Sequence, residues 1–336
     1  MILFISSGAM KATLSAIETE RIYKKVFSKC GTCKIIVTSD GGDGFLDMVK
    51  RAMPELKEKK YVTLSADMKK IKAKVLLSDK CAFIESSLSA GVCKGKMSIL
   101  KRSTAGVGIL INKLYDGKKK VYVGIGGTMT ADMGRGMLEI LGFETESYSG
   151  TNVLKSIKKN KKYPLLLGIS DVISPLNGHN GSSLYFSQKR ADKSERILLQ
   201  AFFDETSYNI KIQNKKFLGS GGGLGAGIFL AGGKIADSFS FLKGPTGLRE
   251  MLNKANIVIV NEGSFDAQSS KGKITGRIVK KSLKMKKRVI VLSGSFDSEI
   301  KGVEFIKVKI PRIKNRIGYK KEFEKAAIKT RELIYG

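Results

Sequence analysis

Short hydrophobic runs followed by helix-like spacing recur at both ends of the chain. Between the first two runs, Ser15 and Glu18 form a capping box that opens a helix with apolar positions three and four residues apart. A second helix follows residue 44 and stops at Pro54. The strands predicted at the two ends are residues 2–6, 34–38, 257–260, 289–292 and 305–308. Five strands with intervening helices predict a flavodoxin-like parallel sheet.

The middle of the chain has a different pattern. Residues 61–64, 71–77 and 81–85 predict consecutive strands without a helix between them, which favours an antiparallel arrangement. Helices near 104–115 and 193–203 and strands at 121–125 and 165–169 follow. We therefore expect an α/β protein in which a flavodoxin-like domain, residues 1–57 and 245–336, carries an inserted α/β domain, residues 58–244, with a mixed or antiparallel sheet.

A glycine turn follows the strand at 121–125. Gly124, Gly126 and Gly127 allow the backbone to turn sharply and to approach a ligand closely. We expect Thr128 and Thr130 to cap the next helix and Asp132 to lie in its first turn. A helix N-terminus at the carboxyl end of a strand is a common anion site. The alternative is a tight turn without a ligand.

Carboxylates beside small residues recur where strands end. They are Asp40 and Asp43, Asp132, Asp171, and Glu262 with Asp266. Mg²⁺ bound together with a phosphate needs one or two carboxylates, so this pattern is typical of a metal–phosphate site. The structural alternative for each acid is a helix cap or a surface turn.

The cluster GSGGGLGAG, residues 219–227, either directs backbone N–H groups at phosphates or permits close helix packing. The chain contains neither a Walker G-x-x-x-x-G-K-[ST] sequence nor a protein-kinase Gly-rich loop followed by a lysine strand. Lys11, after the first strand, and Lys273, near a helix start, could meet a phosphate, and a surface lysine is the alternative for both. The single histidine, His179, is not assigned a catalytic role.

Composition changes this interpretation little. The 336 residues include 61 Lys and Arg against 30 Asp and Glu, a formal charge of +31. Because the lysines are scattered and seldom accompanied by aromatic residues, we expect a solvated basic surface that favours anionic substrates, and no specific nucleic-acid partner.

Cys30 and Cys33 have the spacing of a redox or metal pair, but no second close pair completes a zinc site. The sequence has neither a basic leader nor an apolar run of 18 residues, which predicts a cytoplasmic protein without a membrane partner.

Several motifs, in order, resemble the bacterial-type glycerate kinase family that forms 2-phosphoglycerate. They span nearly the whole chain, which makes the resemblance far more specific than any single motif. The matches are KATLSA at 11–16, SDGGDG at 39–44, GVGILI at 106–111, GIGGTMTADMGRGML at 124–138, SDVISPLNGHNGSS at 170–183, Gln188-Lys189, GSGGGLGAG at 219–227 and NEGSFDAQSSKGK at 261–273.

The resemblance implies ATP- and Mg²⁺-dependent phosphorylation of glycerate, with an active site between two domains. Carried over residue by residue, it implies metal or base roles for Asp40, Asp171 and Asp266, with Asp171 and Asp266 as metal ligands and Glu262 in support. Lys11 and Lys273 would meet phosphate or the substrate carboxylate. The nucleotide phosphates would bind Gly126, Gly127 and Thr128, and Gly221, Gly222 and Gly223, while Lys11, Asp43 and Asn177 would bind substrate. A homodimer is left open.

This sequence departs from the family pattern at several polar positions. Gly8 stands where the family has an acid three residues before the lysine, Ala131 replaces an amide and Met133 a glycine, Asp43 stands for Glu, and Ser264 for Arg. Two alternatives therefore stay open. One is a kinase of another small hydroxy acid, and the other is a non-catalytic nucleotide- or nucleic-acid-binding protein, for which binding to polynucleotide would depend steeply on salt.

Overall fold

The computed structural model describes residues 2–10, 13–158, 161–178, 180–244, 246–265, 273–297 and 300–336. The chain divides into two compact units. Unit 1 comprises Met1–Asp40, Asp47–Ala52 and Ser238–Gly336, and unit 2 comprises Gly41–Leu46 and Met53–Asp237. The expected insertion of one α/β unit into another is therefore present, whereas domain boundaries at residues 57 and 244 stay a prediction.

Unit 1 is built on a five-stranded parallel sheet in the order β13-β12-β11-β1-β2. Counted along the chain, this order is 2-1-3-4-5, which is the flavodoxin arrangement. The sequence prediction of this fold is confirmed. The strands are β1 (Ile2–Ser7), β2 (Thr32–Val37), β11 (Ile257–Phe265), β12 (Arg288–Phe296) and β13 (Val303–Lys307).

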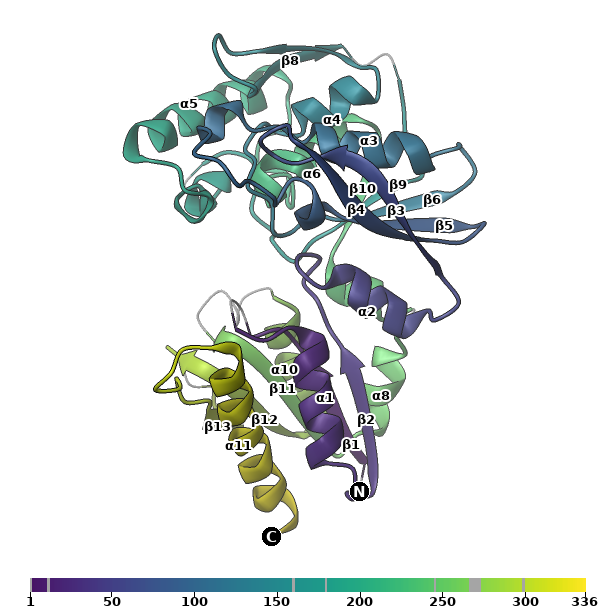
Figure 1. Cartoon of the computed structure of the whole chain (residues 1–336), viewed down its shortest axis with the longest axis vertical. Helices are drawn as coiled ribbons and strands as arrows, with labels where there is room; N and C mark the ends of the chain where they lie inside the picture. The colour runs from purple at the N-terminus through teal and green to yellow at the C-terminus, as the bar shows by residue number, and fades with distance from the viewer. Residues whose placement is uncertain are drawn as a thin grey trace. The chain divides into compact units, whose positions relative to one another are not determined.

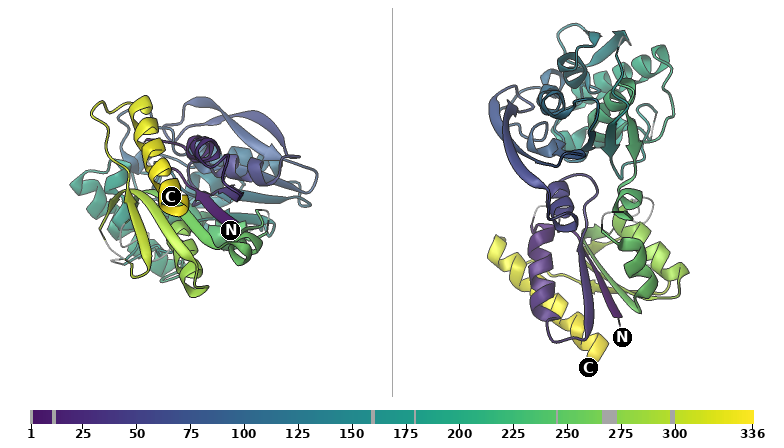
Figure 2. Two further views of the ribbon diagram at one scale, coloured as in Figure 1. Left: turned by 90° about the horizontal axis from the view of Figure 1, so that it is seen from below. Right: turned by 90° about the vertical axis from the view of Figure 1, so that its right-hand side faces the viewer.

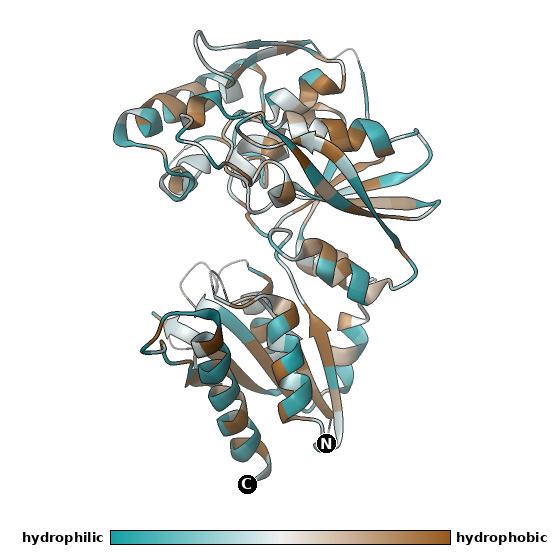
Figure 3. Ribbon diagram, in the orientation of Figure 1, coloured by the Kyte–Doolittle hydropathy of each residue, from teal (hydrophilic) through white to brown (hydrophobic). Residues whose placement is uncertain are grey.

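Helices cover both faces of this sheet (Figures 1 and 2). On one face α1 (Ala16–Val26) packs against α11 (Arg316–Tyr335). There the rings of Tyr23 and Phe323 meet edge to face, with their centroids 5.3 Å apart. The other face carries α7 (Ser238–Leu242), α8 (Leu248–Lys254) and α10 (Ile274–Lys284). The predicted capping box at Ser15 and Glu18 is present. In Figure 3 α1 and α11 alternate hydrophobic and hydrophilic residues, as expected of helices with one buried side.

Unit 2 contains a mixed six-stranded sheet in the order β10-β9-β6-β5-β4-β3. The expected antiparallel part is present as β3, β4 and β5, and the remaining pairs are parallel. A separate two-stranded antiparallel sheet, β7 with β8, was not anticipated because its strands are short and largely polar. The strands are β3 (Lys57–Leu64), β4 (Lys70–Leu77), β5 (Cys81–Glu85), β6 (Lys120–Gly124), β7 (Glu144–Ser147), β8 (Leu154–Lys158), β9 (Leu166–Ile169) and β10 (Lys234–Ala236).

The helices that pack with the sheet of unit 2 enclose its hydrophobic core, which includes Val107, Leu110, Val123, Met137 and Leu224. No described helix is both long and apolar enough to cross a membrane. The α-helices that begin in unit 2 are α2 (Phe45–Ala52), α3 (Ala105–Leu114), α4 (Arg135–Ile140), α5 (Lys193–Asn209) and α6 (Ser220–Leu230), and the 3-10 helices are η1 (Ser86–Leu88), η2 (Ile99–Lys101), η3 (Ser182–Tyr185) and η4 (Ser187–Lys189).

One expectation about the glycine turn is wrong. The helix after β6 starts only at Arg135, behind Gly134 in the left-handed conformation at φ 77°, so Thr128 and Thr130 do not cap it. Asp132 precedes the helix rather than lying in its first turn. Its carboxylate accepts the N–H groups of Gly134 and Gly136, both at 3.1 Å, and thus replaces the expected threonine cap as the acceptor at this helix start.

Candidate active site

Three neighbouring parallel strands of unit 2 end at one edge of its sheet. The register places Glu85 of β5 beside Gly124 of β6, and Gly124 beside Ile169 of β9. The residues just beyond these ends are therefore gathered along the same edge. They include the glycine turn 126–128 and Asp171, which is 5% exposed. Carboxyl ends of parallel strands are where α/β proteins place ligands.

The loop 41–46 packs directly on the glycine turn. Gly126 donates its N–H to the carbonyl of Gly41 at 3.0 Å, and a Cβ on Gly126 would lie 2.6 Å from the Cα of Gly42. Gly127 needs the positive φ of 75° that glycine adopts readily, and a Cβ there would lie 2.9 Å from Oδ1 of Asp43. The structure thus brings together Asp43, Gly126 and Gly127, three of the residues predicted from sequence.

Glu85 holds the loop 41–46 in place through hydrogen bonds. It was not predicted as a site residue from the sequence. Its carboxylate accepts the N–H groups of Gly44 at 3.2 Å and Leu46 at 3.0 Å, and the hydroxyl of Ser87 at 2.9 Å. Burial raises the pKa of Glu85 and the charge of Asp43 adds to that shift, against these hydrogen bonds. The sequence did contain a pointer, because Glu85 ends an apolar strand as Asp171 nearly does.

Two buried cations, Lys189 and Arg102, hold the far end of the turn. Lys189 donates from Nζ to the carbonyl of Thr128 at 2.5 Å and to its hydroxyl at 2.9 Å. Arg102 donates to the carbonyls of Met129 at 3.0 Å and Lys189 at 2.7 Å. Burial lowers the pKa of Lys189 to about 7, the charge of Arg102 acts in the same direction, and Asp132 opposes both. Lys189 appeared in a motif without a role, and Arg102 had no sequence signal.

Asp132 has a structural role. It is 1% exposed and accepts four hydrogen bonds, two from the N–H and hydroxyl of Thr104 at 2.7 and 2.8 Å and two from Gly134 and Gly136. Burial raises its pKa, while these four donors act in the opposite direction. Asp132 therefore joins the starts of α3 and α4.

The glycine cluster that opens α6 packs against the segment that follows β6. Gly221, Gly222 and Gly223 have φ of 62°, 68° and 83°. A Cβ on Gly222 would lie 1.9 Å from the carbonyl oxygen of Thr130. Asn177 lies on a different loop, where its side-chain carbonyl accepts the N–H of Asn214 at 3.1 Å. These contacts give the cluster a packing function, and phosphate or substrate binding by these residues stays a prediction.

Unit 1 has a second group of polar residues where β1 ends beside β11, and the strand order reverses between these two strands. The side-chain amide of Asn261 accepts the N–H of Gly8 at 3.3 Å and donates to its carbonyl at 2.7 Å. Beside it, Glu262 forms an ion pair with Lys273 at 3.1 Å, and Lys273 is the N-cap residue of α10. Asp40 is exposed after β2. Lys11 and Asp266 lie outside the described residues.

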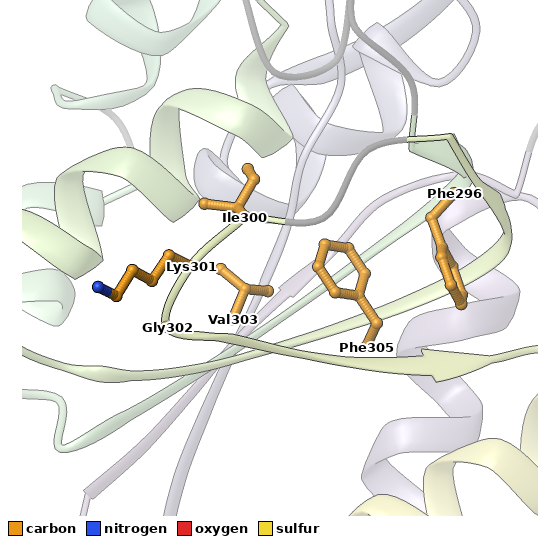
Figure 4. A pocket seen from close by; sticks show the side chains of 6 residues that line it. All are labelled: Phe296, Ile300, Lys301, Gly302, Val303 and Phe305. Carbon is orange, nitrogen blue, oxygen red and sulfur yellow. The ribbon is translucent and has the colours of Figure 1, made fainter.

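Neither group of polar residues coincides with the hollow shown in Figure 4. That hollow lies along β12, β13 and the chain between them, and its lining comprises Phe296, Ile300, Lys301, Gly302, Val303 and Phe305. Among the described residues that line it there is one cation and no carboxylate, and phosphoryl transfer needs both. Within the described ranges, no three His, Cys, Asp or Glu side chains gather closely enough to hold a metal ion by themselves.

The fold and the carboxylates at its strand ends are those of an α/β enzyme. The family model described as "Glycerate kinase family" matches residues 3–334, so the chain belongs to the glycerate kinase family. The resemblance noted in the sequence is thereby confirmed, and the protein is a kinase.

Curated relatives agree with this assignment, and a solved structure has a similar fold. A glycerate kinase of Halalkalibacterium halodurans is 27% identical, over 87% of this chain and 84% of the relative. A glycerate 2-kinase of Escherichia coli is 24% identical, over 89% and 87% respectively. A crystal structure of a candidate glycerate kinase 2 from Salmonella typhimurium LT2 has a TM-score of 0.76 and 23% identity, covering 99% of this chain and 97% of that one, and it supports the fold alone.

Proposed function

We propose that this kinase transfers the γ-phosphoryl group of ATP to a hydroxyl of glycerate, forming 2-phosphoglycerate, with Mg²⁺ bound to the nucleotide. Membership of the glycerate kinase family across residues 3–334 is the observation that carries the proposal. The name of the Escherichia coli relative, glycerate 2-kinase, supports the 2-position. Carboxylates and glycines at strand ends in both units are compatible with this chemistry.

The available donors fit a metal that arrives with the nucleotide. Mg²⁺ in such sites keeps several waters and takes one or two protein carboxylates plus phosphate oxygens. That agrees with strand-end carboxylates and with the lack of a three-ligand cluster among the described residues. We propose Asp171 as one such ligand and Asp266, outside the described residues, as another. The metal would neutralise charge on the transferring phosphoryl group.

The protein's own groups would position the reactants and balance their charge. In unit 1, Glu262 holds the ammonium of Lys273 at 3.1 Å, and we propose that this ammonium binds a phosphate or the substrate carboxylate. Lys11 is proposed for the same role, and Asp40 as a candidate to accept the hydroxyl proton. In unit 2, the turn Gly126–Thr128 and the cluster 221–223 are proposed for phosphates, with Asp43 and Asn177 for substrate.

The test is ADP release from ATP and Mg²⁺ with D-glycerate and with a panel of small hydroxy acids. Phosphorus NMR of the product then separates the 2- from the 3-phosphate. We expect turnover with glycerate that is reduced at least 100-fold by Asp171→Asn and Asp266→Asn and unchanged by the control Asp79→Asn, whose residue is exposed. ATP binding without turnover of any acid would contradict the proposal, as would full activity of both variants.

A second candidate, a kinase for a different small hydroxy acid, is favoured by the surroundings of Gly8. The family pattern that the sequence resembles usually has an acid at this position. Here a Cβ on Gly8 would lie 2.8 Å from the carbonyl oxygen of Asn261, so this chain leaves no room for the usual side chain. A lost polar contact can change discrimination by orders of magnitude. Preferred turnover of another acid in the panel would select this candidate.

A further inference from the structure

The glycine turn after β6 lies next to two buried basic side chains, Lys189 and Arg102, that form no ion pair with any described residue. Lys189 is 7% and Arg102 4% exposed. Every hydrogen bond that these two side chains make with the described residues goes to a carbonyl or to the hydroxyl of Thr128. Burying an unpaired charge is costly, and carbonyl dipoles offset only part of that cost. Lys189 and Arg102 therefore place positive charge beside the turn when both are protonated, and the carboxylate of Asp43, next to Gly127, offsets part of it.

The same turn offers hydrogen-bond donors. Gly127 is exposed, and among the described residues neither its N–H nor that of Thr128 donates to a protein acceptor. Lys189 contacts Thr128 directly through both the carbonyl and the hydroxyl. Backbone donors beside a positive charge make an anion site. The ammonium of Lys189 would stabilise an anion at the turn, because only Thr128 would lie between the two charges.

We propose that Lys189 is a positioning residue that couples the binding of a phosphate group at Gly127 and Thr128 to the uptake of a proton. The inference rests on the proposed function, because the phosphate belongs to the nucleotide. It goes further by giving that binding step a pH dependence and by naming the group responsible. Lys189 acts through Thr128 and need not touch the phosphate.

The direction of the effect follows from linkage. Burial and Arg102 hold the pKa of free Lys189 at about 7, so part of the lysine is neutral at mildly alkaline pH. A nearby phosphate favours the charged form and raises that pKa. Binding therefore takes up as much as one proton, and affinity falls by at most about tenfold per pH unit as the pH rises between the two pKa values.

The other charged groups near Lys189 do not account for such a dependence. Arg102 stays protonated throughout the range. Burial raises the pKa of Asp132, against the four hydrogen bonds that stabilise its carboxylate, and Asp132 is the same in wild type and in the Lys189 variants, so comparing them separates its proton from that of Lys189. The carboxylate of Asp132 accepts its hydrogen bonds from Thr104, Gly134 and Gly136. Proton uptake that Lys189→Arg abolishes would therefore belong to Lys189.

Calorimetry with the Mg²⁺ complex of a non-hydrolysable ATP analogue, between pH 7 and 9 and in two buffers of different ionisation enthalpy, tests this coupling. We expect wild type to take up a proton and to lose roughly tenfold in affinity across the range. Lys189→Arg keeps a fixed charge and should bind with little pH dependence. Lys189→Met should bind about tenfold more weakly near pH 7, without the pH dependence of wild type. The ligand's own titration is common to all three proteins, so it cancels.

If Lys189 only supported the structure of the turn, proton uptake on binding would not depend on which residue stands at position 189. Equal proton uptake by wild type and Lys189→Arg would overturn the coupling, even if Lys189→Met failed to fold. Nucleotide binding without proton uptake would overturn the inference and leave the proposed function intact. A lack of binding by wild type would overturn both. Circular dichroism of each variant checks the fold.

Discussion

Replacing Asp132 by alanine should strongly destabilise the protein. The substitution leaves four buried donors without their acceptor: the N–H and hydroxyl of Thr104 and the N–H groups of Gly134 and Gly136. Each orphaned buried donor costs about 1–3 kcal/mol, and partial relaxation brings the expected total to about 4 kcal/mol. That corresponds to a factor of roughly 10³ in the unfolding equilibrium.

Asp132→Asn is the matched control. An amide oxygen in the place of Oδ2 still accepts from Thr104 and Gly136, whereas the amide NH₂ would face the N–H of Gly134. We expect this lost hydrogen bond to lower the free energy of unfolding by about 1–2 kcal/mol. Urea unfolding followed by circular dichroism measures the loss of stability in both variants. If more than one transition is seen, the transition of unit 2 is the relevant one. Equal losses for the two variants, or less than about 1 kcal/mol for alanine, would refute this account of Asp132.

Two further predictions concern stability. Gly222→Ala should cost more than about 3 kcal/mol, because its Cβ would lie 1.9 Å from the Thr130 carbonyl, whereas Gly150→Ala, also at positive φ but with open space around it, should cost only about 1 kcal/mol in thermal unfolding. Arg316 holds the pKa of Glu18 well below its usual range. The stability this gives should be present above about pH 4.3 and be lost as pH falls through the folded pKa, so wild type and Glu18→Gln should converge in acid; a constant difference would contradict this.

The elements that the sequence predicted well are those with strong local patterns. The strands of the flavodoxin-like sheet are continuous apolar runs, and the capping box at Ser15 and Glu18 marks its helix start by chemistry that acts within four residues. The antiparallel part of unit 2 followed from three strands without a helix between them. Each of these predictions depends on neighbours in sequence.

The parts that sequence reasoning missed depend on contacts between distant segments. Thr128 was expected to cap a helix, but its hydroxyl accepts from Lys189, and Asp132 takes over at the helix start. Local pattern could not show that Glu85 holds the loop 41–46, or that Arg102 reaches Met129. Such side chains are chosen by the tertiary fold, where burial and a specific acceptor override intrinsic preference.

The close approach of Gly42 and Gly126 constrains how this sequence can change over time. The two residues belong to motifs far apart in the chain, yet a Cβ on Gly126 would lie 2.6 Å from the Cα of Gly42. A larger residue at position 126 could therefore be accepted only together with a shift of the loop 41–46. Among homologous chains that keep this loop in place, position 126 should stay glycine.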